Sequence, residues 1–307
     1  MIVTLTPNPS IDRVLIVPGF RRADVRRVAE RRDDTGGKGV NVARVIATLG
    51  EPTLVCGPLG GITGGQIAAL AAAEGLPTAW TTVAGESRIC LLITDADDGD
   101  TLTINERGPQ LAAEDWERFA ADVQRRAAGA SALTCSGSLP PGVLPDQLFA
   151  LLSRAAAPVY LDTSGAALLA ALGQPFAAIK VNGHEIGEAL GIAVETPEQA
   201  AVAAREVVRR GAARAIVTLG AGGAVAADAT GAWHAAPPSI RMVSPVGSGD
   251  AVLSGAVVAI ARRSAALPDA LRLGVACGTA NALTAGAGSV AIADIERIYA
   301  DVTLRDC

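Results

Sequence analysis

Short apolar runs alternate with longer alanine-rich stretches along most of the chain, and this alternation constrains the fold more than any other feature. The apolar runs predict strands at residues 2–5, 53–56, 132–135, 159–161, 178–181 and 215–219. The alanine-rich stretches predict helices near 39–49, 64–74, 113–128, 145–156, 197–210, 250–262 and 268–285. Strands that alternate with helices indicate an α/β fold of three layers, with helices on both faces of a mainly parallel central sheet. Ligands of such sheets bind at the carboxyl ends of the strands.

Two stretches, at about 11–35 and 87–105, break this alternation because they read as strands without helices between them. Their predicted strands are 13–17, 25–32, 88–94 and 101–105, and Asp97-Asp-Gly-Asp100 suits a hairpin turn between the last two. We expect them to pair as one small sheet, a lid over the site, within a single domain of residues 1–307. A lid that excludes water is useful where water competes with an acceptor hydroxyl.

Composition excludes several classes of protein. The net charge is −5 and no basic block occurs, so we expect no nucleic-acid partner. No run of 18 apolar residues is present and the amino terminus lacks the pattern of a signal peptide, so we expect no membrane segment. The five cysteines show no C-x-x-C spacing and are expected to be reduced, mostly buried thiols of a cytoplasmic protein.

The segment Val246-Gly-Ser-Gly-Asp250 opens an apolar helix. Glycines let backbone amides approach a ligand closely, and the helix amino terminus adds unpaired N–H groups that suit a phosphate. Gly247, Ser248 and Gly249 are therefore candidates for an anion-binding loop, and Asp250 for a base that takes a proton from an attacking hydroxyl. A helix capped by an ordinary Asp is the structural alternative.

Only two of the 26 basic residues are lysines. Lys38 lies in Gly36-Gly-Lys-Gly-Val-Asn41 and Lys180 in Ile179-Lys-Val-Asn-Gly-His-Glu185, and both segments look like ligand loops. A lysine supplies a compact point charge that arginine does not replace everywhere. We therefore expect both lysines to bind ligand.

Three further signals are weaker when taken alone. Thr218-Leu-Gly-Ala-Gly-Gly223 directly follows a strand and offers amides and a hydroxyl to a nucleotide, although it is neither a dinucleotide fingerprint nor a P-loop. Asn182 and Glu185 suit a hydrated Mg²⁺, with a simple helix cap as the alternative. Asp12 follows the first strand and suits sugar hydroxyls, with a structural loop Asp as the alternative.

Together these segments resemble the PfkB (ribokinase-like) carbohydrate kinases. Gly36-Gly-Lys-Gly-Val-Asn-Val-Ala-Arg44 resembles the first signature of that family and Val246-Gly-Ser-Gly-Asp250 the second. The resemblance continues through Leu5-Thr-Pro-Asn-Pro-Ser-Ile-Asp12, Gly85-Glu-Ser-Arg88, Asn105-Glu-Arg-Gly-Pro109, Ser136-Gly-Ser-Leu-Pro-Pro-Gly142, Asp162-Thr-Ser-Gly165 and Thr218-Leu-Gly220. It is strongest to the branch that contains the 1-phosphofructokinases and tagatose-6-phosphate kinases. The residues Pro-Val-Gly-Ser-Gly-Asp250 and Arg88-x-Cys90 slightly favour the tagatose-6-phosphate kinases.

Two departures from the family pattern stand out. Ser244-Pro245 replaces the usual Asp-Thr, which argues against the ribokinase and adenosine kinase branches. Lys180-Val-Asn182 replaces the usual Lys-Pro-Asn, which leaves the placement of Lys180 open.

The resemblance implies a role for each matching residue. It implies Asp250 as the base, with Gly247, Ser248 and Gly249 as the anion hole. It implies a sugar site of Asp12, Gly37, Lys38 and Asn41, with Arg88, Lys38 and Ser136 on a phosphate that the sugar already carries. It implies an ATP site of Lys180, Asn182, Thr218, Gly220, Gly223 and Asn281, with Glu185 acting on Mg²⁺ through water.

The expected activity is ATP- and Mg²⁺-dependent phosphorylation of a ketohexose monophosphate to a bisphosphate. Without a phosphate partner, desolvating Arg88 and Lys38 beside a neutral sugar would cost several kcal/mol. The alternatives are a kinase of an unphosphorylated sugar or nucleoside and, from another class, a non-catalytic metabolite-binding protein. The preferred hexose phosphate stays open, as does the choice between a monomer and a dimer that covers the edges of the lid.

Overall fold

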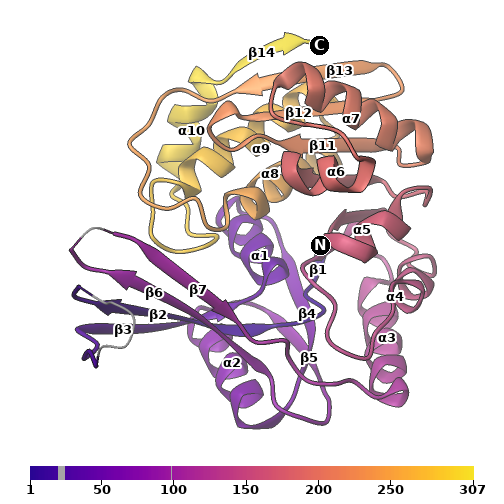
Figure 1. Ribbon diagram of the computed structural model, residues 1–307. Helices are drawn as coiled ribbons and strands as arrows, with labels where there is room; N and C mark the ends of the chain where they lie inside the picture. Colours follow the sequence, from indigo (N-terminus) through magenta and orange to yellow (C-terminus); the bar gives the residue numbers. More distant parts are fainter. Residues whose placement is uncertain (20–24, 98) are drawn as a thin grey trace.

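The computed structural model describes residues 1–19, 25–97 and 99–307. Within these ranges, ten strands form one large sheet in the order β14-β13-β12-β11-β10-β9-β8-β1-β4-β5 (Figure 1). The seven strands from β11 to β5 run parallel, and β12, β13 and β14 continue the sheet in antiparallel fashion. The predicted three-layer α/β fold with a mainly parallel sheet is confirmed.

The large sheet consists of β1 (Ile2–Leu5), β4 (Thr53–Leu59), β5 (Thr78–Thr82), β8 (Ala132–Ser136), β9 (Val159–Asp162), β10 (Ala178–Asn182), β11 (Arg214–Thr218), β12 (Ala224–Asp228), β13 (Gly231–Ala236) and β14 (Thr303–Asp306). The helices are α1 (Lys38–Thr48), α2 (Gly61–Ala73), α3 (Ala113–Ala127), α4 (Pro145–Leu152), α5 (Gly165–Ala171), α6 (Gly183–Leu190), α7 (Pro197–Arg210), α8 (Ser248–Arg263), α9 (Leu267–Asn281) and α10 (Ile292–Asp301).

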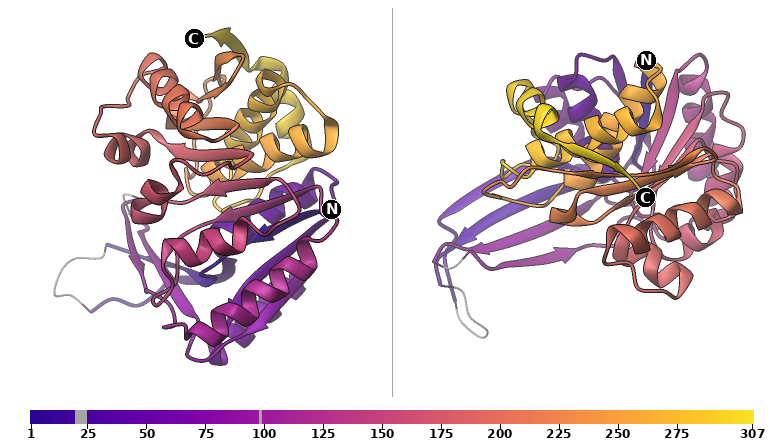
Figure 2. Two further views of the ribbon diagram at one scale, coloured as in Figure 1. Left: turned by 90° about the vertical axis from the view of Figure 1, so that its right-hand side faces the viewer. Right: turned by 90° about the horizontal axis from the view of Figure 1, so that it is seen from above.

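Strand β1 shows why the sheet needs helices on both faces. Its four residues are all buried, and successive side chains point to opposite faces of the sheet. Val3 and Leu5 pack in the core that includes α3 and α7, whereas Ile2 packs against α1 and α8. The right-hand view of Figure 2 separates the yellow helices near the carboxyl terminus from the salmon helices on the other face.

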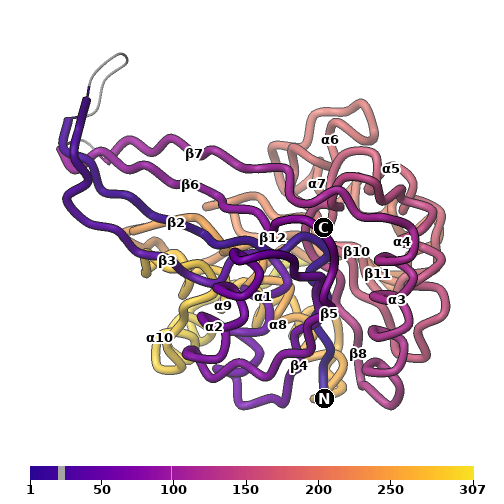
Figure 3. The backbone as a smooth tube through the Cα atoms, turned by 90° about the horizontal axis from the view of Figure 1, so that it is seen from below, coloured from indigo at the N-terminus to yellow at the C-terminus, as the bar shows by residue number. Residues whose placement is uncertain are grey.

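A second sheet, which we call the small sheet, has the order β3-β2-β6-β7. It consists of β2 (Ser10–Val17), β3 (Glu30–Gly36), β6 (Arg88–Asp95) and β7 (Thr101–Asn105). The strands extend sideways from the body of the molecule, as Figure 3 shows from below. Helix α2 packs beneath the root of the sheet, where Ile11 and Ile89 join Leu59 and Ile67 in one apolar cluster.

The predicted strand at 25–32 is wrong in its position. The strand is Glu30–Gly36, whereas Val25 is 94% exposed and lies outside it. Charged cross-strand pairs set this register, because Arg13 on β2 lies opposite Asp33 and donates to both of its carboxylate oxygens at 2.8 Å. Residues 20–24 of the stretch 11–35 lie outside the described residues.

Other elements were absent from the sequence prediction. Strand β5, the antiparallel strands β12, β13 and β14, and the helices α5 and α10 belong to this group, whereas the start of α6 was predicted with the cap at Asn182. The runs are short or poor in apolar contrast, so periodicity alone does not separate them from loops. The helix predicted at 268–285 ends at Asn281, where the glycine-rich segment 284–288 begins.

None of the helices in the described ranges is long and apolar enough to cross a membrane. Four of the five cysteines are buried, as expected, and Cys307 is partly exposed.

Candidate functional site

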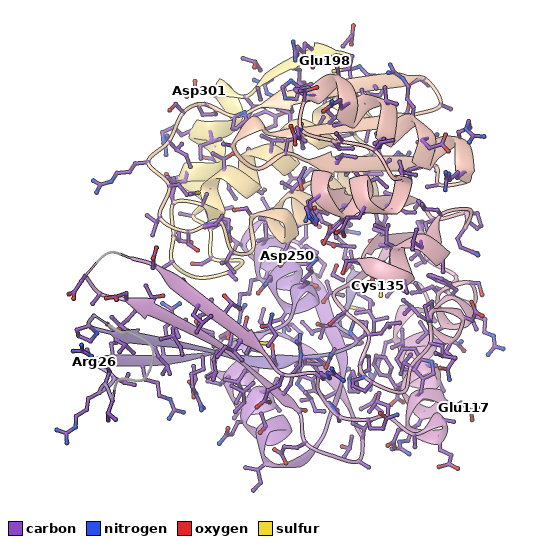
Figure 4. All side chains as sticks on the ribbon, in the orientation of Figure 1. Arg26, Glu117, Cys135, Glu198, Asp250 and Asp301 are labelled. Carbon is purple, nitrogen blue, oxygen red and sulfur yellow. The ribbon has the colours of Figure 1, made fainter. Side chains whose placement is uncertain are left out.

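The carboxyl ends of four neighbouring parallel strands place the candidate residues side by side. Strand register pairs Ser136 with Asp162, Asp162 with Lys180, and Asn182 with Thr218. Helix α8 begins above this edge, and Figure 4 labels its Asp250 near the middle of the molecule. The site therefore lies where the doubly covered sheet predicts it.

Asp162 joins the two lysines of the chain. Its carboxylate is fully buried and accepts a hydrogen bond from Lys38 Nζ at 3.0 Å and from Lys180 Nζ at 2.8 Å. Burial opposes the charge of Asp162, but the two ammonium groups outweigh it and lower the pKa of this carboxyl. The Asp162 carboxylate, against the opposing cost of burial, raises the pKa of Lys38. Lys38 is therefore positively charged at neutral pH.

The glycine loop lies directly against this charged group. Gly247 has φ of 83°, and a Cβ there would come within 2.9 Å of the Ala287 Cα, so only glycine fits this turn. A Cβ on Gly249 would lie 2.7 Å from Lys180 Nζ. A positive side chain therefore faces the positive end of helix α8, an arrangement that favours an anion between them.

Asp250 lies in the first turn of α8 and is 5% exposed. Asn41 Nδ2 donates to its Oδ2 at 2.8 Å. Burial and then the nearby Asp162 carboxylate raise the pKa of Asp250 to about 6, against the opposing effects of Lys180, Lys38 and the Asn41 hydrogen bond. A carboxylate with this pKa is ionised at pH 7 and still basic enough to accept a proton from a hydroxyl.

The side-chain amide of Asn281 supports the glycine loop through hydrogen bonds. Its side chain is fully buried, donates to Val246 O at 2.8 Å and accepts from Gly288 N at 2.8 Å. Both ends of its amide are thus used inside the protein. The structure places Asn281 as a support of the loop, and direct contact with a nucleotide stays a prediction.

Asn182 and Glu185 form a capping box at the start of α6. Asn182 Oδ1 accepts from Glu185 N at 2.8 Å, and Glu185 Oε2 accepts from Asn182 N at 3.0 Å. The structural alternative for this pair is therefore present. Glu185 Oε1 remains 4.0 Å from Lys38 Nζ and lies beside the charged group.

The donor set near Glu185 fits Mg²⁺ only as a hydrated ion. Within the described residues no three His, Cys, Asp or Glu side chains gather as a metal cage. Asp162 is engaged by two lysines, whereas Glu185 Oε1 accepts no hydrogen bond among the described residues and lies 4.0 Å from Lys38 Nζ, so it can serve as a carboxylate ligand. Because Mg²⁺ keeps several of its waters in proteins, one such oxygen beside bound phosphates is a suitable set.

The turn after β11 forms the next part of the edge. Gly220 has φ of 56° and open space beside its Cα, and Gly223 has φ of 82°, where a Cβ would lie 2.0 Å from Ala235 O. Leu219 in this turn packs near Gly183 of α6, so the turn and the capped helix are neighbours. Thr218, Gly220 and Asn182 thus lie near one another at this edge, whereas Gly223 is buried and shapes the turn; their contact with a nucleotide stays a prediction.

The small sheet brings Asp12 to the other side of the site. Ser10 Oγ donates to Asp12 Oδ1 at 2.8 Å, and a Cβ on Gly36 would lie 2.0 Å from the same oxygen. Burial raises the pKa of Asp12 despite this hydrogen bond and the nearby Arg88. Gly37, with φ of 111°, turns the chain from β3 into α1 and so sets Lys38 and Asn41.

Arg88 lies at the root of the small sheet in a cavity of about 390 Å³. Asn8, Asn105, Glu106, Arg107, Ser138, Leu139 and Pro141 line the same cavity. Among the described residues, the guanidinium of Arg88 donates to two main-chain carbonyls, Asn8 O at 3.0 Å and Glu106 O at 3.3 Å, and forms no ion pair with a carboxylate. Arg88 therefore presents a charge that a bound anion can neutralise.

Two expected members of this phosphate site lie elsewhere. Ser136 is fully buried in β8 and its Oγ has no partner, whereas Ser138 lines the cavity. Lys38 belongs to the Asp162 group and does not line the cavity of Arg88. Ser136 stays outside the cavity because it is the last residue of the central strand β8, and the chain leaves the sheet only after it.

Asp162 and Ser138 are the main residues that sequence reasoning did not assign. The signal for Asp162 was available, because it is a polar residue at the end of an apolar strand, as Asn182 is. The two serines of Ser136-Gly-Ser138 differ only in where the strand stops, and sequence does not fix that boundary.

Comparison with known proteins agrees with this geometry. Residues 6–293 match the model of the pfkB family of carbohydrate kinases. The chain is 33% identical to the 1-phosphofructokinase of Bacillus subtilis, over 94% of this chain and 95% of that protein. It is 32% identical to the ATP-dependent 6-phosphofructokinase isozyme 2 of Mycobacterium tuberculosis, over 97% of this chain and 88% of that protein.

The fold comparison gives the same result. The crystal structure of phosphofructokinase-2 from Escherichia coli in complex with potassium superposes with a TM-score of 0.92 at 32% identity, and covers 98% of both chains. The resemblance that the two glycine-rich segments predicted is confirmed, and the chain belongs to the pfkB family of carbohydrate kinases.

Proposed function

We propose that this protein transfers the γ-phosphoryl group of ATP to a ketohexose monophosphate and produces a bisphosphate. The observation that carries the proposal is the presence of two separate cationic sites. Lys38 and Lys180 lie at the glycine loop beside Asp250, whereas Arg88 has its own cavity at the root of the small sheet. One site suits the phosphoryl group in transfer, and the other suits a phosphate already on the sugar.

The proposed reaction is an in-line attack by a sugar hydroxyl. Asp12 and Asn41 orient the sugar, and Asp250 accepts the proton of the attacking hydroxyl. The amides of Gly247, Ser248 and Gly249, together with Lys180 and Lys38, stabilise the charge on the transferring group. The turn of Thr218, Gly220 and Gly223 with Asn182 binds the remainder of ATP. Mg²⁺ near Glu185, when bound, would supply positive charge to the ATP phosphates.

We assign the small sheet the role of a lid over the sugar within a single domain of residues 1–307. Asp12 and Arg88 both belong to this sheet, so its closure would deliver sugar ligands and exclude water together.

The same sheet suggests a dimer. Strand β7 is exposed along its whole length, and Leu102 and Ile104 are 47% and 46% exposed on it. Such an edge favours pairing with a second copy of the chain. A sedimentation experiment should show a dimer that Ile104→Asp dissociates and that Ile62→Asp, at an exposed position on α2, leaves intact. A wild-type monomer would refute this assembly.

The substrate is tested by ADP release from ATP and Mg²⁺ with fructose 1-phosphate, fructose 6-phosphate, tagatose 6-phosphate, fructose, ribose and adenosine. Activity confined to phosphorylated ketoses supports the proposal, and the ranking of kcat/KM identifies the preferred sugar. The lean to tagatose 6-phosphate stays a prediction, since the two named relatives above are phosphofructokinases. Activity on neutral sugars or nucleosides alone would contradict the role of Arg88, and no activity at all would favour a metabolite-binding protein.

A further inference from the structure

Arg44 of α1 is the most highly connected side chain near the site, and none of the assignments above includes it. Its guanidinium donates from Nε to Glu74 Oε2 at 2.6 Å and from Nη2 to Glu74 Oε1 at 2.8 Å. It also donates from Nη1 to Asn41 Oδ1 at 2.9 Å and to Ala287 O at 3.2 Å, and from Nη2 to Thr35 O. All five N–H donors of the arginine are therefore used.

These bonds fix the orientation of the Asn41 amide. Arginine has only donors, so the Asn41 atom that faces Arg44 has to be the carbonyl oxygen. The nitrogen of the same amide then has to face Asp250, where Nδ2 donates to Oδ2 at 2.8 Å. Without Arg44 the amide is free to turn its oxygen toward the Asp250 carboxylate, which is a repulsive arrangement.

The same guanidinium touches the two structures that surround the base. Thr35 lies near the end of β3, so its carbonyl links Arg44 to the small sheet. Ala287 lies against Gly247 of the glycine loop, so the bond to Ala287 O links Arg44 to the support of that loop. Arg44 is 15% exposed in its side chain and is held in place by the Glu74 carboxylate.

We propose that Arg44 is a positioning residue that, through Asn41, holds the carboxylate of Asp250 in its reactive orientation and ties that orientation to the small sheet. The proposal deepens the proposed kinase function and rests on it for the role of Asp250. Lysine at position 44 would not reproduce the arrangement, because an ammonium group offers three donors without the planar fork.

The charged groups that face Asp250 from the neighbouring elements are Asp162 on β9, Lys180 on β10 and Lys38 on α1. All three remain in an Arg44 variant, but the variant also removes the positive charge of the guanidinium, so a change that comes through Asn41 is identified by its absence in an Asn41→Ala background. Loss of a hydrogen bond to a carboxylate raises its pKa, here by about one unit.

The test compares Arg44→Met with Arg262→Met, which removes an arginine that bonds Glu51 far from Asn41. The first readout is the carboxyl ¹³C titration of Asp250 in the free protein, identified by its loss in Asp250→Asn. Arg44→Met should raise the midpoint by about one unit, and Arg262→Met should leave it unchanged. In the kinase assay, Arg44→Met should lose about fivefold more kcat/KM at pH 6 than at pH 8.

A double variant separates positioning from general damage to the structure. In an Asn41→Ala background, Arg44→Met should shift the Asp250 midpoint no further, because the connecting amide is gone. An unchanged midpoint in Arg44→Met, or an equal shift with and without Asn41, would overturn the proposal. If Arg44→Met does not fold, Arg44→Lys should show a smaller shift in the same direction, and no shift would overturn it. Wild-type protein that phosphorylates none of the sugars would refute the kinase proposal. The titration of Asp250 would still test the positioning role of Arg44 in that case.

Discussion

The two cationic regions of the site differ in how their charge is balanced before any ligand binds. In the deep region, Lys38 and Lys180 share the buried carboxylate of Asp162. In the region at the root of the small sheet, Arg88 donates to main-chain carbonyls alone, among the residues that the structure describes. The deep region is already organised, with one carboxylate shared between two lysines, whereas Arg88 forms no ion pair among the described residues and can gain one from a ligand.

This difference separates two tasks. A preorganised group needs little rearrangement during the reaction, so it is suited to stabilise a transition state. A solvated charge that pairs only on binding contributes mainly to affinity for the bound anion. We therefore expect changes in the deep region to lower kcat or stability, and changes at Arg88 to raise KM for the phosphorylated sugar.

The largest expected effect is that of Asp250→Asn, which removes the proton acceptor and keeps the shape. The value of kcat should fall by about 10²–10⁴-fold while KM values stay within a few-fold. The melting temperature should not fall, because the raised pKa shows that the ionised carboxylate is unfavourable in its buried site. Steady-state kinetics and thermal unfolding measure both, and near-normal turnover would remove Asp250 from the mechanism.

The next largest effect is expected for Asp162→Asn, which should lower the free energy of unfolding. This substitution removes the carboxylate that is hydrogen-bonded to the ammonium group of Lys180, which is 5% exposed in its side chain, at a cost of about 3 kcal/mol of unfolding free energy. Asp294→Asn, which breaks an exposed pair with Arg297, should cost less than about 0.5 kcal/mol. ATP should restore part of the loss in Asp162→Asn, since its phosphates would pair with the freed lysine.

The sign of the pH dependence follows from the lowered pKa of Asp162. Its carboxylate stabilises the fold fully above its ordinary pKa near 4, and this stabilisation is lost as the pH falls further. The difference in urea stability between wild type and Asp162→Asn should therefore shrink below about pH 4. A difference that stays unchanged as the pH falls well below that value would mean that the ion pairs are not its cause.

A smaller effect concerns the pH profile of the reaction. Because the pKa of Asp250 is raised to about 6, kcat/KM should fall about tenfold per pH unit below that value. The phosphate of the sugar titrates in the same range, with a second pKa near 6. The pH profile of the residual activity of Asp250→Asn is the control. A fall at low pH that comes from the substrate phosphate persists in this variant, whereas a fall that comes from Asp250 does not.

Sequence predicted the architecture and the segments that meet at the candidate site because both depend on local patterns. Buried strands such as Ile2–Leu5 and glycine turns such as Gly247 carry their signal in adjacent residues. The register of β3 depends on Arg13 meeting Asp33 across the sheet, which no single segment contains. The partner of the two lysines depends likewise on two strands and a helix that meet only in the folded chain, so Asp162 was not assigned.

The division of tasks between the two regions is tested most directly by a cycle that combines Arg88→Ala with removal of the sugar phosphate. The value of kcat/KM is measured for wild type and variant, each with a phosphorylated ketohexose and with fructose at high concentration. The account predicts a loss of about 10²-fold with the phosphorylated sugar and little change with fructose, because only the former offers Arg88 a partner. Equal losses with both substrates would show that Arg88 does not bind that phosphate and would contradict the division.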